Sequence, residues 1–354
     1  MKTLSILFLL ALMVPDLSAQ QQESEKEDSK KIKIAALPYI NYSRTIDFSY
    51  GLMGTAFYKV NAEDSISPSS STMLIGIYST SKSYVGMLVQ QFFLAEDTWR
   101  TKISVGTGTG NLQFYEEFYT GGQFVDYSNN MRFLVGRVSR RLVSNLFVGV
   151  SGGISNSRTE FDLEPEQVID IPLNFLGGFV QSDSRNNVNY PSNGHKIEAD
   201  YKNFGAWLGN DQSFHRLDLT YDHYSNFGNE DRVFLARFHS RISFGDVPFV
   251  GQHTVGGENI RGYSEGRYRD NELYSIQGEY RHKFKSRFGF VAFGGFAMVT
   301  PDISELFDQL VLPGVGAGIR YRILQKEKIN LGLDVAVGRN DWSLSFLISD
   351  AFSR

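Results

Sequence analysis

The chain has 354 residues, a formal net charge of −4, 34 glycines, 14% aromatic residues and no cysteine. Disulfides, thiolate nucleophiles and a lipid anchor attached through cysteine are therefore excluded, and the acidic balance without a basic run argues against a nucleic-acid surface. Length alone is compatible with two ordinary domains or with one barrel.

The first 33 residues predict an export signal and a tail. Residues 1–19 carry Lys2, an apolar run over 4–14 and the small pair Ser18-Ala19, a pattern typical of a secretory signal peptide cleaved near Ala19. The apolar run is shorter than the roughly 20 residues that span a bilayer. Residues 20–33 begin with a charged stretch without periodicity, which predicts a disordered periplasmic tail. No later apolar run is long enough for a membrane helix, so a membrane protein with this sequence must cross with strands.

From Ile34 onward, segments of roughly ten residues alternate between apolar and polar and are separated by turn signals, as in a transmembrane barrel. We therefore predict an all-β fold, a 16-stranded antiparallel transmembrane β-barrel over residues 34–354. Short turns are expected at 226–229, 285–287 and 325–327, and long connections at 112–129, 161–173, 245–270 and 300–311. The predicted strands are 34–44, 48–60, 71–80, 83–94, 98–111, 130–141, 145–160, 174–184, 195–205, 213–224, 231–244, 272–284, 288–299, 312–323, 328–338 and 341–352.

The alternation also predicts which side chains face the lumen. Over 195–244 and 272–284, one face of four consecutive strands carries charges of both signs, among them Lys196, Glu198, Arg237 and Glu279. A soluble sandwich is the alternative, but it needs a second sheet to cover the apolar face, and no further family of segments remains.

The long loop over residues 245–270 has a composition that a simple linker does not need. Gly256, Gly257 and Gly262 allow sharp turns, and Arg261, followed by Tyr263, offers a rigid fork of donors for a carboxylate. The loop either folds back into the lumen, held by Arg261, or is a solvated extracellular loop.

Several motifs resemble the BamA/TamA family of outer-membrane assembly factors. Asp246-Val247-Pro248-Phe249, then Gly256-Gly257, then Ile260-Arg261-Gly262-Tyr263 is similar to the family's sixth extracellular loop, and the turn from Asp183-Ser184-Arg185 to Tyr190-Pro191-Ser192-Asn193-Gly194 and the segment 277–281 are also similar. The resemblance implies that Arg261 contacts Glu279 inside the lumen. In the family the next strand adds an aspartate, whereas Phe293-Gly294-Gly295-Phe296 has none. Phe352 resembles the family's C-terminal aromatic signal, although Ser353 and Arg354 follow it.

No catalytic constellation is found in the sequence. Of the six histidines, His239 between Arg237 and Arg241 is better explained by a charge network than by a general base. Acid pairs such as Glu116-Glu117 lack metal-ligand spacing. We therefore expect no enzyme, no cofactor and no metal.

The resemblance predicts a protein of the Gram-negative outer membrane that inserts or translocates other outer-membrane proteins through a weak seam between the first and last strands. Pro38 in the first strand cannot donate a ladder hydrogen bond, which suits such an edge. The expected partners are outer-membrane lipid, unfolded outer-membrane proteins and accessory subunits, because family members usually carry receiving domains that a short tail cannot contain. A passive or gated pore, or a structural subunit of an outer-membrane complex, is the alternative.

Overall fold

The computed structural model describes residues 32–43, 47–116, 123–163, 167–187, 190–325 and 328–348. The predicted signal peptide, nearly all of the predicted tail and Phe352 lie outside these residues. The prediction of an all-β fold is confirmed over the described part of the chain.

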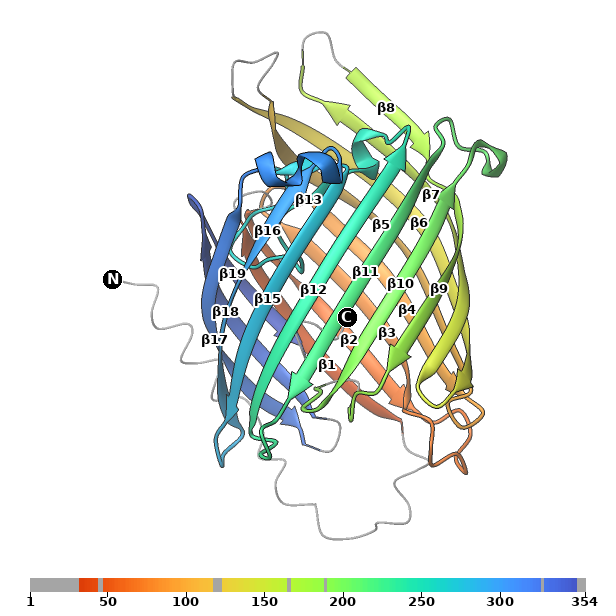
Figure 1. The fold of residues 1–354 in the computed structure, drawn as a ribbon, viewed down its shortest axis with the longest axis vertical. Helices are drawn as coiled ribbons and strands as arrows, with labels where there is room; N and C mark the ends of the chain where they lie inside the picture. Colours follow the sequence, from red (N-terminus) through yellow and green to blue (C-terminus); the bar gives the residue numbers. More distant parts are fainter. Residues whose placement is uncertain are drawn as a thin grey trace.

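Most of the strands belong to one antiparallel sheet that returns on itself (Figure 1). Of the seventeen strands in this sheet, all but β8 pair in chain order around the wall, and β1 also pairs with β19. The wall strands in the described residues are β1 (Lys33–Ser43), β2 (Asp47–Tyr58), β3 (Ser70–Ser79), β4 (Tyr84–Leu94), β5 (Trp99–Glu116), β6 (Gln123–Val143), β7 (Leu146–Phe161), β9 (Phe175–Asp183), β10 (Gly194–Phe204), β11 (Phe214–Ser225), β12 (Arg232–Gly245), β15 (Glu272–Lys283), β16 (Phe288–Thr300), β17 (Leu312–Leu324), β18 (Ile329–Gly338) and β19 (Asp341–Ile348).

The predicted strands agree closely with the wall, except at its tallest part. The prediction that 112–129 is a long connection is wrong at both ends, because β5 continues to Glu116 and β6 begins at Gln123. The predicted loop 161–173 likewise contains β8 (Gln167–Pro172), which pairs with the end of β7. These parts form an extension above the upper rim (Figure 1). Their side chains lack a strict apolar alternation because neither face needs to meet hydrocarbon there.

The two faces of the wall differ as the alternation predicts. Large apolar side chains such as Ile197, Phe238 and Ile276 are exposed on the outer face. Their sequence neighbours on the inner face, such as Arg237 and Gln277, are buried inside the barrel. None of the helices in the described residues, which are all short 3-10 turns, has the length and apolar character needed to cross a membrane.

Candidate functional site

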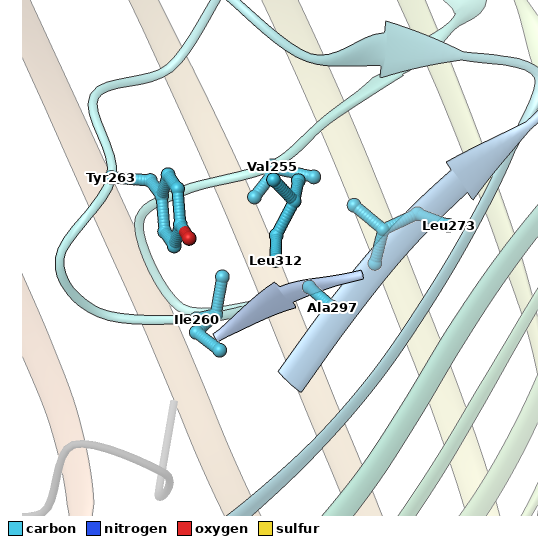
Figure 2. Close-up of a cluster of buried hydrophobic side chains, with 6 residues drawn as sticks. All are labelled: Val255, Ile260, Tyr263, Leu273, Ala297 and Leu312. Carbon is cyan, nitrogen blue, oxygen red and sulfur yellow. The ribbon is translucent and has the colours of Figure 1, made fainter. Parts of the chain in front are cut away.

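The long loop folds into the upper half of the barrel. It contains η5 (Phe249–Gly251) and a two-stranded ribbon of β13 (His253–Thr254) and β14 (Arg269–Asp270). An apolar cluster holds the loop against the inner faces of three wall strands (Figure 2). Burial of each large apolar side chain contributes about 1.5–3 kcal/mol to the free energy of folding. The cluster consists of Val255, Ile260 and Tyr263 from the loop with Leu273, Ala297 and Leu312 from the wall.

Arg261 lies at the tip of the loop and bridges two carboxylates on different strands. Its Nη2 is 2.7 Å from Oε2 of Glu279 on β15, and its Nη1 donates to Oδ2 of Asp334 on β18 at 2.9 Å. The guanidinium also stacks on Phe293, 3.4 Å from the ring centroid. Both carboxylates are about 1% exposed. The structure thus brings Arg261 and Glu279 together and adds a second acid.

Two further arginines complete an ion cluster, defined here as Arg261, Arg281, Arg320, Glu279 and Asp334. Arg281 Nε donates to Glu279 Oε1 at 2.7 Å, and Arg320 Nη2 donates to Asp334 Oδ2 at 3.1 Å. Each carboxylate therefore has its own arginine on the wall and shares the arginine of the loop. The cluster carries three positive and two negative charges, so removing an acid leaves a larger imbalance than removing Arg261.

The second acid comes from a strand that sequence reasoning did not consider. Residues 293–296 contain no aspartate, and the second carboxylate that binds Arg261 is that of Asp334 on β18. Its neighbours Leu333 and Val335 are exposed on the outer face. An isolated acid at an inward position of an otherwise apolar strand is the signal that could have revealed it.

Strand β17 provides the space in which the tip of the loop lies. Its inward positions before Arg320 are Gly314, Gly316 and Gly318. A Cβ on Gly314 would lie 2.5 Å from the carbonyl oxygen of Arg261, one on Gly316 would lie 2.5 Å from the Phe293 ring, and one on Gly318 would overlap the carboxylate of Asp334. The alternating glycines therefore form a groove for the loop, a role that sequence analysis missed.

The rest of the motif is bound to the β18–β19 hairpin. The Gly262 amide donates to Ser343 Oγ at 3.1 Å, and the Ser264 amide donates to Asp341 Oδ2 at 2.8 Å. Gly262 has φ +103°, and a Cβ there would lie 2.7 Å from the Val337 carbonyl carbon, so both its conformation and its surroundings require glycine. The Tyr263 hydroxyl donates to the Pro313 carbonyl at 2.7 Å and accepts from the Arg339 amide at 2.8 Å.

The two ends of the loop reach the opposite wall. Phe249 packs among Phe114, Tyr127 and Phe161, with ring centroids 5.3–5.4 Å away. Arg269 stacks on Phe249 and donates to the Tyr127 hydroxyl at 3.0 Å. The loop is thus fixed to β5–β7 on one side and to β15–β19 on the other, and it crosses the lumen.

The seam between β1 and β19 is the shortest boundary in the described wall. It has two residue pairs, Asn41 with Ser345 and Tyr42 with Leu344, whereas β1 and β2 share eleven. Tyr42 stacks on Trp342 across the seam with centroids 5.0 Å apart. Continuing this register would place Pro38 opposite Ile348, the last described residue, and a proline has no amide hydrogen to donate. The ladder is therefore short and lies at the upper end of the seam.

The histidines lie in structural settings. His239 is buried between Arg237 and Arg241 on the inner face, and His215 stacks between Tyr201 and Phe244 on the outer face. Within the described ranges no group of three or more His, Cys, Asp or Glu side chains has a geometry that could hold a metal ion.

Comparison with known proteins places these features in a class. Residues 171–323 match the model of the Omp85 superfamily domain. BamA from Haemophilus ducreyi lacking POTRA domains 1-3 has a similar structure, with TM-score 0.61 and 13% identity over 90% of this chain and 70% of that one. CdiB from Acinetobacter baumannii has TM-score 0.56 and 14% identity over 89% and 59%, and CdiB from Escherichia coli has TM-score 0.60 and 10% identity over 89% and 63%. No curated protein matches the sequence.

The paired wall, its apolar outer face and the loop held inside it define a β-barrel with the BamA fold. The chain is similar to BamA in fold, and its match to the Omp85 superfamily domain covers residues 171–323. It spans 59–63% of the length of the two CdiB chains.

Proposed function

We propose that this barrel inserts or translocates other outer-membrane proteins through the seam between β1 and β19. The observation that carries the proposal is the ladder between these strands, which has only two residue pairs in the described residues. The neighbouring boundary, between β18 and β19, has eight. A strand edge with few hydrogen bonds is a template on which the strand of a client can pair. In this proposal residues 1–19 are the export signal, the barrel begins at residue 34, and unfolded outer-membrane proteins and accessory subunits are its partners.

The ion cluster supports the same function by anchoring the loop on the C-terminal side of the seam. The loop tip contacts β18 and β19 through Asp334, Ser343 and Asp341. It therefore fixes the C-terminal side of the seam, so that β1 is the strand with fewer restraints. We propose Ile260-Arg261-Gly262-Tyr263 as the locking motif and Glu279 as its lumenal partner, and Phe352 as the assembly signal of the barrel itself.

A disulfide across the seam tests the proposal, because the chain has no native cysteine. Asn41→Cys with Ser345→Cys joins a pair that is in register. The oxidised barrel is expected to lose insertion of a reporter outer-membrane protein into proteoliposomes and to recover it on reduction. The control is Val105→Cys with Leu134→Cys, a register pair within the fully laddered β5–β6 boundary, whose oxidation leaves insertion unchanged. Full insertion by the oxidised seam variant would reject the seam mechanism.

A passive or gated pore is the second candidate, favoured by the charged lumen. Below the long loop lies an internal cavity of about 180 Å³ whose lining is entirely polar or charged, including Lys196, Asp218 and His239. In the same experiment a pore shows ion conductance that does not depend on the state of the seam and shows no insertion of the reporter.

A further inference from the structure

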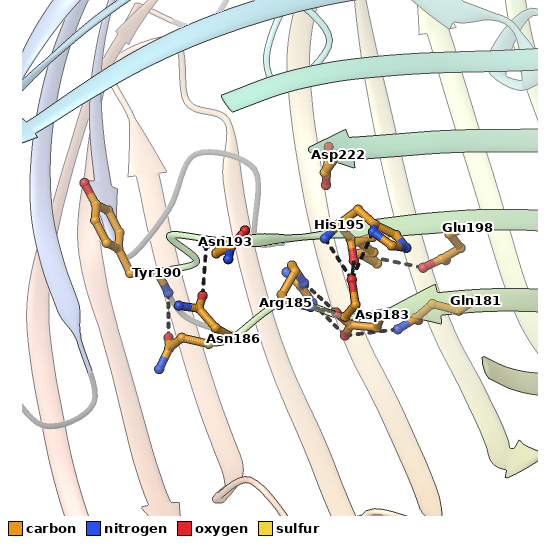
Figure 3. Close-up of polar contacts among 12 residues, drawn as sticks. Gln181, Asp183, Arg185, Asn186, Tyr190, Asn193, His195, Glu198 and Asp222 are labelled. Carbon is orange, nitrogen blue, oxygen red and sulfur yellow. Dashed lines mark hydrogen bonds and ion pairs between the residues drawn. The ribbon is translucent and has the colours of Figure 1, made fainter. Parts of the chain in front are cut away.

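The turn between β9 and β10 differs from the turn between β11 and β12 in the direction in which it folds. Its described residues, 184–187 and 190–193, fold inward (Figure 3), and Tyr190 and Ser192 are buried. By contrast, the turn between β11 and β12 leaves Phe227 74% exposed. Folding inward is thus a property of this sequence and not a general consequence of a turn at the lower rim.

The base of the turn is held by a buried ion group. Arg185 donates to both oxygens of Asp183, at 2.8 and 3.1 Å, and Arg100 of β5 donates to the same carboxylate at 3.1 Å. Arg185 and Asp183 have side chains only 5% and 4% exposed. Since β5 lies three strands from β9 in the wall, Asp183 ties the beginning of the turn to a distant part of the barrel.

The turn is also braced internally. The Asn186 side chain accepts from the Ser192 and Asn193 amides at 3.0 and 3.2 Å and donates to Ser192 Oγ at 2.7 Å. One side chain thus accepts hydrogen bonds from two successive amides of the returning arm. These bonds join the two arms of the turn to each other.

The far end of the turn crosses to the opposite wall. The Tyr190 ring lies under the guanidinium of Arg281 on β15, 4.8 Å away, and near that of Arg322 on β17, 5.5 Å away. Arg281 Nη1 also donates to the Pro191 carbonyl at 3.4 Å. The wall order from β10 to β17 has four strands in between, so this contact spans the lumen.

The turn and the long loop are separate structures that are linked through Glu279 and Arg281. Glu279 binds Arg261 of the loop through Oε2 and Arg281 of the wall through Oε1. Loss of Arg261 therefore leaves Glu279 with Arg281, which continues to hold Pro191. The polar cavity lies between the two, lined by Glu258 of the loop and by Lys196, which pairs in register with Asp183 at the base of the turn. Its volume is enough for several waters, since one needs about 10–15 Å³.

We propose that the β9–β10 turn is a second closure of the lumen, at the mouth opposite the long loop, and that it keeps the barrel shut when the loop is displaced. The closure goes beyond the proposed insertion function, because it concerns passage of small solutes through the lumen and not the seam. The side chains that form it are Asp183, Arg185, Asn186 and Tyr190, with Arg281 and Arg322 as their supports on the wall.

Conductance of the full-length barrel in planar bilayers tests the closure. The variants are Arg261→Ala, Tyr190→Ala and both together, each purified as the heat-modifiable folded form. The double variant is expected to conduct several-fold more than Arg261→Ala. A double variant with no more conductance than Arg261→Ala would overturn the proposal. Phe227→Ala in the Arg261→Ala background is the matched control, since it removes an aromatic from a turn that lies outside the lumen, and it is expected to leave conductance unchanged.

A reversible lock separates closure from damage to the fold. Tyr190→Cys and Arg322→Cys in the Arg261→Ala background are joined by a reducible bifunctional thiol crosslinker. The joined form is expected to conduct at the level of Arg261→Ala, and the same molecules are expected to conduct several-fold more after reduction. Equal conductance before and after reduction, with the crosslink verified by mass spectrometry, would reject the closure. Neither experiment depends on insertion, so their failure leaves the seam proposal standing, and the seam disulfide tests that separately.

Discussion

At the scale of single residues, the ion cluster decides what each substitution costs. Arg261 is the third arginine around two acids, so Glu279 and Asp334 each keep a wall arginine when it is lost. Glu279, by contrast, serves two arginines. Breaking a buried ion pair is most expensive when it leaves a charge without compensation. The loop arginine is thus less critical to the barrel than the acid that receives it.

We therefore expect Glu279→Ala to destabilise the barrel more than Arg261→Ala. Glu279→Ala leaves Arg281 without its carboxylate and Asp334 as the only acid of the cluster, and it is expected to cost about 3–5 kcal/mol, as for a buried charge that loses its partner. Arg261→Ala is expected to cost about 1.5–3 kcal/mol, the range for hydrogen bonds to charged groups. The measurement is the urea midpoint of the folded, heat-modifiable band. Equal midpoints for the two variants would show that the wall arginines do not compensate the acids.

His253 in the long loop makes the loop sensitive to acid. Burial, and next the Arg216 guanidinium, lower the pKa of His253 to about 3, and its Nε2 is 2.9 Å from Ser243 Oγ. The unfolded imidazole takes up a proton near its ordinary pKa of about 6.5, whereas the folded one stays neutral. The contribution of His253 to stability is therefore complete above pH 6.5 and decreases as the pH falls from 6.5 toward 3.

We expect His253→Gln to reduce the loss of stability between pH 7 and pH 4. Glutamine retains a polar group near Ser243 but does not titrate. The urea midpoint of each protein at both pH values gives the comparison, and His195→Gln, at a half-buried position on the wall, is the control. If the two histidine variants and the unmodified chain lose stability equally, protonation of His253 is not coupled to folding.

At the scale of elements, the loop tip is held to β19 through two of its backbone amides, those of Gly262 and Ser264. Substitution of the loop side chains cannot remove these bonds, but substitution of their acceptors on β19 can. We expect Asp341→Asn with Ser343→Ala to loosen the loop by about 1.5–3 kcal/mol, since one acceptor is charged, while the wall is unaffected. Protease cleavage within 256–268 from the loop side of the barrel measures the effect, and Ser345→Ala on the same strand is the control. Cleavage no faster than in the control would show that these bonds do not hold the loop.

The wall strands were predictable from sequence because lipid on one side and polar contacts on the other enforce a period of two. The signal fails where that constraint ends. Residues 111–116 of β5 and 123–129 of β6 continue as a ladder above the rim with mixed side chains, and β8 pairs without any apolar alternation. Asp334 and the glycines of β17 could not be assigned from one strand alone, because their roles depend on the loop that the fold places beside them. The inward position of Glu279 was predictable, since it follows from strand parity.

At the scale of the whole molecule, the wall has no long free edge from which it can unravel, apart from the seam. Barrels of this kind resist detergent until heated, because every strand pair must be broken together. We expect the folded protein to migrate faster than the boiled chain on a cold detergent gel. The seam disulfide between positions 41 and 345 is expected to raise the temperature at which the fast band disappears, whereas the control disulfide between 105 and 134 raises it less. An equal rise for both pairs would mean that the seam is not the weak boundary.

The alternating glycines of β17 determine which positions of this strand accept substitution. At 314, 316 and 318 any added methyl group collides with the loop backbone, an aromatic ring or a carboxylate. At 315, 317 and 319 the side chains are exposed on the apolar outer face and can be exchanged for one another at little cost. Saturation mutagenesis of this strand should therefore produce a tolerance profile with a period of two, in which permitted and forbidden codons alternate.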